Sequence, residues 1–211
     1  MKITYCLRVL VLILTGISAF VNASDRNAQL GIRAGLNVNK LSITELRSTD
    51  TDMREGFSVG LTTKTSLTKQ FSFVPEVNFC YRVLGSYKFD FSFLPAPEEY
   101  TIDEMSISIP IMVHFVPVEN VPFYLAAGIQ FDFPFNCNMK ITTAGKSVSE
   151  SMGRISRDFY FPFGLGYMVT PSLGIDSRFY YFDKLFYDYY GYGRTTFWSF
   201  GFGVSYFLKI Q

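Results

Sequence analysis

The feature that most constrains this chain is an alternation of side-chain size near its C-terminal end. Between Phe197 and Lys209, large apolar side chains occupy every second position, and glycine or serine fills most positions between them. A period of two is typical of a β-strand whose two faces meet different surroundings. The length suits a membrane-spanning strand of roughly 9–11 residues, whereas a soluble sandwich strand would seldom carry so many aromatic side chains on one face. The large side chains are Trp198, Phe200, Phe202, Val204, Tyr206 and Leu208.

Seven earlier segments alternate in the same way, which makes an even total. They cover residues 30–38, 56–67, 71–83, 105–115, 123–135, 159–168 and 173–182. The connections between them are alternately short and long, as in bacterial outer-membrane barrels. An open sheet would leave unpaired backbone groups in lipid, so the first and last strands are expected to pair. The pattern predicts an all-β protein: an eight-stranded antiparallel up-and-down transmembrane β-barrel of the outer-membrane type.

The four long connections, at 39–55, 84–104, 136–158 and 183–195, are expected to be extracellular loops. They are the natural places for contacts with extracellular or envelope proteins. Two details within the strands are also predicted. Pro75 removes a ladder donor, so a β-bulge is expected there. The aromatic alternation at 87–93 either extends the third strand above the bilayer or forms a separate loop strand.

The N-terminal segment predicts export. Lys2 and Arg8 form a positive region ahead of an apolar run at 9–20, and small residues lead to a cleavage site after Ala23. Residues 1–23 are therefore predicted to be a signal peptide, and 24–211 a single barrel domain in the bacterial outer membrane. Without Lys2 and Arg8, the 19 basic side chains fall to 17 against 18 acidic ones, a net charge of −1 that suggests no nucleic-acid partner. Cys80 and Cys137 are expected to be unpaired thiols.

If the large faces meet lipid, the small faces line the lumen together with eight ionisable side chains. An eight-stranded barrel is just wide enough for its side chains to fill it. Buried charges of mixed sign then predict a salt-bridged plug, with Glu76 expected to pair with Arg82 or Arg33. The alternative is a narrow polar path in which the same residues set ion preference. The predicted polar network is Arg33, Lys64, Glu76, Arg82, His114, Asp132, Asp176 and Arg178.

The opposite faces carry the aromatic side chains expected in the girdles at the two membrane interfaces. This surface makes outer-membrane lipid the first expected partner. The tyrosines at 187–192 are expected to belong to the upper girdle, with protein binding as the alternative. The predicted lipid-facing residues are Trp198, Phe200, Phe202, Tyr206, Phe161, Phe163, Tyr167 and Tyr181.

Catalysis is not expected. His114 is the only histidine, and the chain has neither a nucleophile-elbow motif nor a metal-ligand cluster. An inward histidine more often forms hydrogen bonds in the lumen than it performs chemistry. The expectation is therefore no enzyme activity, no catalytic residue, no metal and no cofactor.

Several stretches resemble the small outer-membrane β-barrel family described as porin-family or PorT-like, which is common in Bacteroidetes. The resemblance lies in GIRAGLNVNKL at 31–41, GFSVGLTTKTSLTKQFSFVPEVNFCYR at 56–82, SISIPIMVHF with PFYLAAGIQF at 106–131, and FGLGYMVTPSLGIDSRFYY at 163–181. It implies an outer-membrane barrel, and the porin label does not imply a channel. Some relatives serve protein secretion, and the resemblance does not extend to the long loops.

Five functional hypotheses follow. The first is a largely plugged barrel with a structural or surface-interaction role through its long loops. The second is a narrow porin-like channel for ions or small solutes, and the third is an accessory component of protein secretion. A membrane-embedded hydrolase or acyltransferase that uses His114 ranks last among the membrane roles. A soluble ligand-binding barrel would have to expose the outward aromatic side chains to water.

Overall fold

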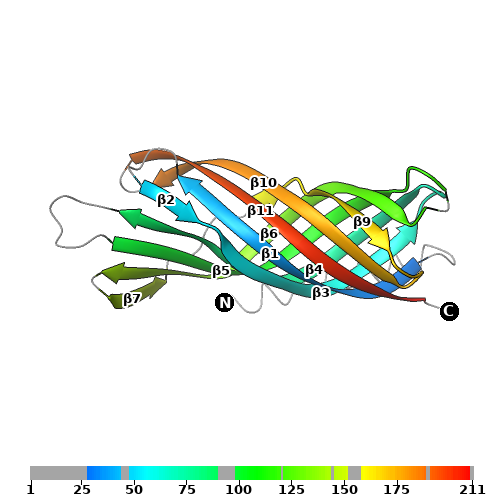
Figure 1. Cartoon of the computed structure of the whole chain (residues 1–211), viewed down its shortest axis with the longest axis horizontal. Helices are drawn as coiled ribbons and strands as arrows, with labels where there is room; N and C mark the ends of the chain where they lie inside the picture. Colours follow the sequence, from blue (N-terminus) through cyan, green and yellow to red (C-terminus); the bar gives the residue numbers. More distant parts are fainter. Residues whose placement is uncertain are drawn as a thin grey trace.

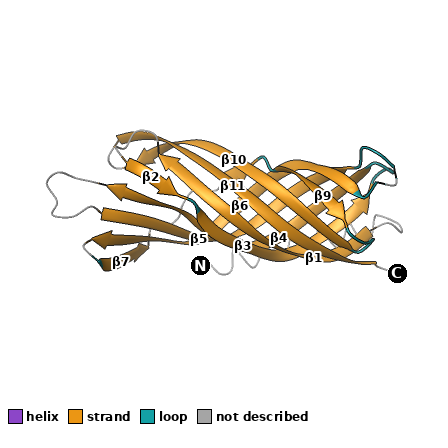
Figure 2. Cartoon of the chain, viewed as in Figure 1, coloured by secondary structure: helices purple, strands orange, loops and turns teal. Residues whose placement is uncertain are grey.

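The computed structural model describes residues 28–43, 48–89, 98–119, 121–143, 145–151, 158–188 and 191–209, so the predicted signal peptide lies outside it. These residues form an all-β structure (Figure 2). Among them no helix could cross a membrane. The strands are β1 Ala28–Ile43, β2 Ser48–Asp52, β3 Arg54–Ser66, β4 Phe71–Phe89, β5 Glu98–Phe115, β6 Phe123–Thr143, β7 Lys146–Ser151, β8 Asp158–Tyr160, β9 Phe163–Met168, β10 Leu173–Asp188 and β11 Gly191–Lys209.

Eight strands close into a ring in the order β1, β3, β4, β5, β6, β9, β10 and β11. Each neighbouring pair is antiparallel, and β1 pairs with β11 from Gln29–Lys209 up to Ile43–Thr195. Figure 1 shows the strands crossing the long axis of the barrel at a slant. Closure satisfies the edges that an open sheet would expose to lipid. The predicted eight-stranded barrel and the pairing of its first and last strands are confirmed.

Side-chain exposure alternates along the barrel strands as the sequence predicts. On β11, Phe202 is 62% exposed and Tyr206 48% exposed, while Gly203 and Ser205 between them are buried. The same holds on β1, where Leu36 is 71% exposed and Arg33 is 4% exposed. The outer surface is therefore apolar and the inner surface polar, the reverse of a soluble barrel.

The predicted boundaries of the long loops are wrong, because the strands continue well into them. β4 runs to Phe89 and pairs with β5 from Glu98, while β10 and β11 stay paired up to Asp188–Gly191. Two further strands lie in the other predicted loops: β2 pairs with β4, and β7 pairs with β6. Backbone pairing needs no apolar face when water solvates both sides of a strand, so polar sequence did not end the ladders. Residues 44–47, 90–97, 152–157 and 189–190 lie outside the described residues.

The register of β4 differs from the prediction at two places. Its pairing with β3 keeps one register from Thr62–Glu76 to Thr65–Phe73, so no residue is inserted at Pro75 and the predicted bulge is wrong. The ladder between β3 and β4 omits the pairs of Val74 and Pro75, because proline has no N–H to donate. The shift occurs instead between Val83 and Gly85, opposite β5. Beyond it β4 continues through Tyr87, so the third predicted strand extends rather than ending.

The sixth predicted strand is interrupted. β8 and β9 pair with β6 in one common register, from Phe123–Tyr167 to Asp132–Asp158, but Phe161 and Pro162 between them are not in a strand. Pro162 still accepts a hydrogen bond from the Gly128 amide at 3.0 Å. Because proline lacks a backbone donor, this side of the ladder loses a bond at the same point.

Candidate functional site: the barrel interior

The alternation brings four oppositely charged side chains together across the lumen. Arg33 comes from β1, Glu76 from β4, and Asp176 and Arg178 from β10; all four are at least 94% buried. We call these four residues the central cluster. Its charges balance, as two buried cations and two buried anions require in a place with little water.

The central cluster is joined by short, directed contacts. Arg178 donates from both terminal nitrogens to the two oxygens of Glu76, at 3.0 and 2.7 Å. Asp176 Oδ1 accepts from Arg33 Nη2 at 2.6 Å and lies 2.8 Å from Arg178 Nε. The Asn78 amide donates to Glu76 Oε2 at 3.0 Å. Two-pronged arginine–carboxylate pairs are among the strongest polar contacts in proteins, and here they tie β4 to β10 across the barrel.

A second group, which we call the loop-side cluster, lies toward the extended strands and contains Arg82, Glu104 and Asp132. Arg82 pairs with Asp132, and its Nη2 lies 3.6 Å from Glu104 Oε1. The same nitrogen donates to Ser106 Oγ at 2.9 Å. The Gln130 amide donates to Asp132 Oδ1 at 2.8 Å. One arginine thus faces two carboxylates, while the Ser106 hydroxyl accepts from the arginine and the Gln130 amide donates to Asp132.

The expected partners of Glu76 are partly revised by this geometry. Arg178, which the sequence assigns to the polar network but not to Glu76, forms the two-pronged pair with Glu76. Arg33 is near it, with Nε 3.9 Å from Glu76 Oε1, while Arg82 belongs to the loop-side cluster. Glu104 was also missed, because it was assigned to a loop. The alternation of Ser106 and Ser108 continues back to position 104, and that was the signal for its inward direction.

His114 and Lys64 lie toward the short turns and join neither cluster. The His114 ring stacks on Tyr124, with centroids 4.3 Å apart and planes 14° apart. Its Nε2 has no hydrogen-bond partner among the described residues. Lys64 is half-buried, with Nζ 5.9 Å from the centroid of the Phe207 ring. Ser106 and Ser108, the serine candidates for chemistry with His114, instead contact Arg82.

Apolar side chains cap the two charged layers at both ends. Toward the short turns, Tyr124 packs with a group of buried and half-buried apolar residues. Toward the extended strands, the rings of Tyr160 and Phe197 meet at 5.8 Å and 66°. Close packing of this kind leaves little free volume. The first group is Val74, Met112, Tyr124, Ala126, Val116 and Met168, and the second is Tyr160, Phe197, Leu84, Tyr100 and Ile102.

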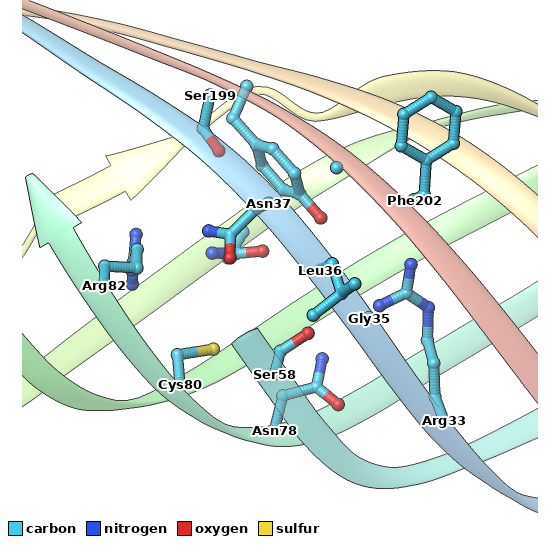
Figure 3. A pocket seen from close by; sticks show the side chains of 13 residues that line it. Arg33, Gly35, Leu36, Asn37, Ser58, Asn78, Cys80, Arg82, Ser199 and Phe202 are labelled. Atoms are coloured by element: carbon cyan, nitrogen blue, oxygen red, sulfur yellow. The ribbon is translucent and has the colours of Figure 1, made fainter. Parts of the chain in front are cut away.

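Between the central and loop-side clusters lies a small cavity of about 40 Å³ (Figure 3). Arg33 and Arg82 stand on opposite sides of it, and Asn37 lies between them. Ser58, Asn78, Gln130, Tyr180 and Ser199 also line it. Most of the residues that line the cavity are polar, and its volume is smaller than the 300–1,000 Å³ typical of a drug-sized ligand site.

The predicted lipid-facing aromatic residues point away from the lumen. Trp198 is half-buried, and the other seven are at least 37% exposed. Some form pairs on the outer wall, such as Phe200 with Phe202 at 4.9 Å. The exposed members are Phe161, Phe163, Tyr167, Tyr181, Phe200, Phe202 and Tyr206.

Metal and thiol chemistry have few candidate groups. In the part of the chain that the structure describes, no three histidine, cysteine or carboxylate side chains gather in a way that could hold a metal ion. Cys80 and Cys137 are both free and buried. The Cys80 sulfur lies 3.2 Å from Ser108 Oγ and lines the cavity.

Comparison with known proteins gives a family and several similar folds. The family described as "Outer membrane protein beta-barrel domain" matches residues 20–209. No curated protein matches the sequence. Among solved structures, Ail of Yersinia pestis is 15% identical, covering 85% of this chain and 99% of its own, with a TM-score of 0.45. Neisserial surface protein A is also 15% identical, covering 87% and 99%, with a TM-score of 0.46. OprG of Pseudomonas aeruginosa is 11% identical, covering 88% and 98%, with a TM-score of 0.43.

Proposed function

This chain belongs to the outer membrane protein beta-barrel domain family, and we propose that it acts as a closed barrel with a structural or surface-interaction role. The bacterial outer membrane is the location expected of this family. The observation that carries the proposal is the filled interior: two ion-pair clusters capped at both ends by apolar side chains. Arg178 and Glu76, on strands that face each other across the lumen, stand where a solute would have to pass.

Surface interaction is supported by the strands that rise beyond the barrel. β4 pairs with β5, β5 with β6, β2 with β4 and β7 with β6, which forms a projecting sheet (Figure 1). All six residues of β7 are exposed, including Val148 at 59%. Such a sheet offers backbone groups and side chains to an extracellular or envelope protein. An accessory role in protein secretion, which the PorT-like resemblance implies, would use this same surface.

The experiment is single-channel recording of the purified protein in planar bilayers. Folding is checked by the change in gel mobility on heating, and an open porin with a water-filled channel serves as the positive control. A closed barrel gives no current steps above background while the porin conducts. Reproducible steps that depend on folded protein would contradict the proposal.

A narrow channel is the second candidate, and the polar cavity between the clusters favours it. This function requires both apolar caps and both ion-pair clusters to rearrange during conduction. It predicts current steps whose ion selectivity changes in Arg33→Gln and Glu76→Gln, because these side chains would line the path. Steps with unchanged selectivity in both variants would count against a path through the central cluster.

A further inference from the structure

β7 is an exposed strand at the edge of the projecting sheet. It runs from Lys146 to Ser151, and all six of its side chains are exposed. One side of β7 pairs with β6, and among the strands that the structure describes none pairs with the other side. Figure 1 shows this hairpin at the end of the molecule away from the C-terminus. The unpaired backbone groups of an edge strand can extend the ladder to a strand of another molecule.

The charged and apolar side chains of β7 are arranged symmetrically. Side chains at alternate positions point to the same face of a strand, so Lys146, Val148 and Glu150 share one face. Val148 lies midway between the basic and the acidic residue, and it is 59% exposed. Turning the strand end for end therefore exchanges the positions of the two charges. β7 is thus complementary to an antiparallel copy of itself.

We propose that the free edge of β7 pairs with β7 of a second copy of this chain, antiparallel and centred on Val148. In this register Lys146 lies opposite Glu150 of the second copy, and Val148 lies opposite Val148 of the second copy. Cross-strand pairs of opposite charge stabilise antiparallel sheets. The inference rests on the surface-interaction role proposed above, and it names the partner for that role.

The same register extends an apolar row of the projecting sheet. Val148 pairs with Ile141 on β6, and Ile141 pairs with Tyr100 on β5. Ile141 and Tyr100 are both half-buried. When the two Val148 side chains meet, they join the rows of the two molecules and remove exposed apolar surface from water, which is favourable.

The charges also favour the antiparallel direction over a parallel one. A parallel pairing in register would place Lys146 beside Lys146 of the second copy, and Glu150 beside Glu150 of the second copy. Like charges that lie directly opposite each other destabilise a sheet. The antiparallel pairing replaces both repulsive contacts with attractive ones.

The antiparallel direction sets how the two barrels face each other. A two-fold axis relates the two strands of such a pair, and this axis is perpendicular to the sheet. The projecting sheet continues the barrel wall along the long axis (Figure 1), so the rotation turns the second barrel end for end. Barrels in one membrane all point the same way. The second copy must therefore lie in a facing membrane, and the β7 pair is an adhesive contact between two outer surfaces.

One such contact is weak, because it covers only residues 146–150 of each copy. Stable specific interfaces bury about 1,200–2,000 Å² in total, more than two short edge strands provide. Many copies on each membrane raise the overall strength of attachment through multivalency. The purified protein should therefore be monomeric in detergent, while membranes that contain many copies should adhere.

The test is the clustering of liposomes that contain the purified full barrel, followed by light scattering, with folding checked by the change in gel mobility on heating. The parent protein should cluster liposomes. Lys146→Glu and Glu150→Lys should each slow clustering by at least about tenfold, because each places like charges opposite each other. Mixing liposomes of these two variants should restore clustering, because every cross-strand pair is then between opposite charges. The double variant should cluster with itself and not with the parent protein.

Three results would overturn the inference. Equal clustering by all variants would show adhesion that does not depend on β7. No clustering by the folded parent protein would remove the second copy as the partner, in favour of a strand from a different protein. A mixture of the two single variants that fails to cluster would contradict the charge pairing. None of these results depends on the current recordings, so a closed barrel that does not cluster liposomes would contradict only the β7 contact.

A matched pair of cysteine variants tests the register. In Val148→Cys the two new thiols lie opposite each other, so oxidation of clustered liposomes should give a disulfide-linked dimer. Ser151→Cys is equally open to solvent but lies outside the paired residues 146–150, so it should give at least about tenfold less dimer. The native Cys80 and Cys137 are buried, and the parent protein measures their contribution. Equal dimer yields from the two variants would contradict the pairing centred on Val148.

Discussion

The central and loop-side clusters both pair buried charges inside the barrel, but they differ in the number of arginines that do so. In the central cluster two arginines face two carboxylates, and Asp176 contacts both arginines. In the loop-side cluster, as far as the described residues show, Arg82 is the cation that pairs with Asp132 and Glu104, and Ser106 and the Gln130 amide add hydrogen bonds. The central cluster therefore has a second cation close to each anion. The loop-side cluster has one described arginine, Arg82. Replacing Arg82 should therefore destabilise the barrel more than replacing one arginine of the central cluster.

The largest effect is expected for Arg82→Met. Removing one partner of a buried ion pair costs about 3–5 kcal/mol, because the remaining charge stays out of water. Asp132 would keep its hydrogen bond from Gln130 but lose its counter-charge. The measurement is the free energy of unfolding in urea, followed by fluorescence of Trp198, the single tryptophan.

The matched control for that variant is the double change Arg82→Met with Asp132→Asn. It removes one anion along with the cation, so part of the lost stability should return. Losses that simply add in the double variant would show that Arg82 and Asp132 do not act as a pair.

A smaller loss, about 2–3 kcal/mol, is expected for Arg178→Met. Glu76 would lose its two-pronged partner but retain the Asn78 amide, and Arg33 would remain beside both carboxylates. The same urea titration provides the measurement. If Arg178→Met destabilises the barrel more than Arg82→Met does, the proposed difference between the clusters is wrong.

Two inward glycines on β11, Gly201 and Gly203, allow a second comparison in which smaller changes in stability are expected. A Cβ at Gly203 would collide with the Arg33 guanidinium, which Asp176 holds in place, so Gly203→Ala should cost about 1–3 kcal/mol. A Cβ at Gly201 meets only ordinary contacts, so Gly201→Ala should cost at most about 1 kcal/mol. Equal unfolding midpoints in urea for the two variants would mean that the Arg33 side chain can move away from an added Cβ and is not held in place by Asp176.

The smallest effect is expected for Lys64→Met, which lies outside both clusters. The change removes a half-exposed ammonium over the Phe207 ring, a contact worth about 0.5 kcal/mol at such sites. The free energy of unfolding should stay within about 0.5 kcal/mol of that of the parent protein. A loss comparable to that of the arginine variants would place Lys64 in the buried network.

The sequence predicts which charged side chains face the lumen, but it does not predict which of them pair. Strand parity alone assigns Arg33, Glu76, Asp176 and Arg178 to the interior, because a period of two leaves each side chain one of two directions. It does not pair them: Glu76 and Arg178 are 102 residues apart and meet only because the ring closes with a particular stagger.

Other errors in the predicted strand boundaries arise because a polar sequence was taken to mark the end of a strand. The polar alternation of β2 and β7 resembles a loop, although backbone pairing continues in water without an apolar face. The same error left Glu104 in a loop and out of the predicted network. The break at Pro162 could have been anticipated from the missing N–H, and the effect of Pro75 was overestimated from the same property.

The central claim, that side chains close the lumen, is tested most directly by the chemistry of Cys80. This thiol is buried at the cavity between the two clusters. In a Cys137→Ala variant, a small water-soluble thiol reagent is added to the folded barrel in lipid and, separately, to the barrel unfolded in urea. A closed lumen predicts rapid labelling of Cys80 after unfolding and almost none before. Rapid labelling of the folded barrel would contradict the account, because the reagent would have reached the middle of the lumen.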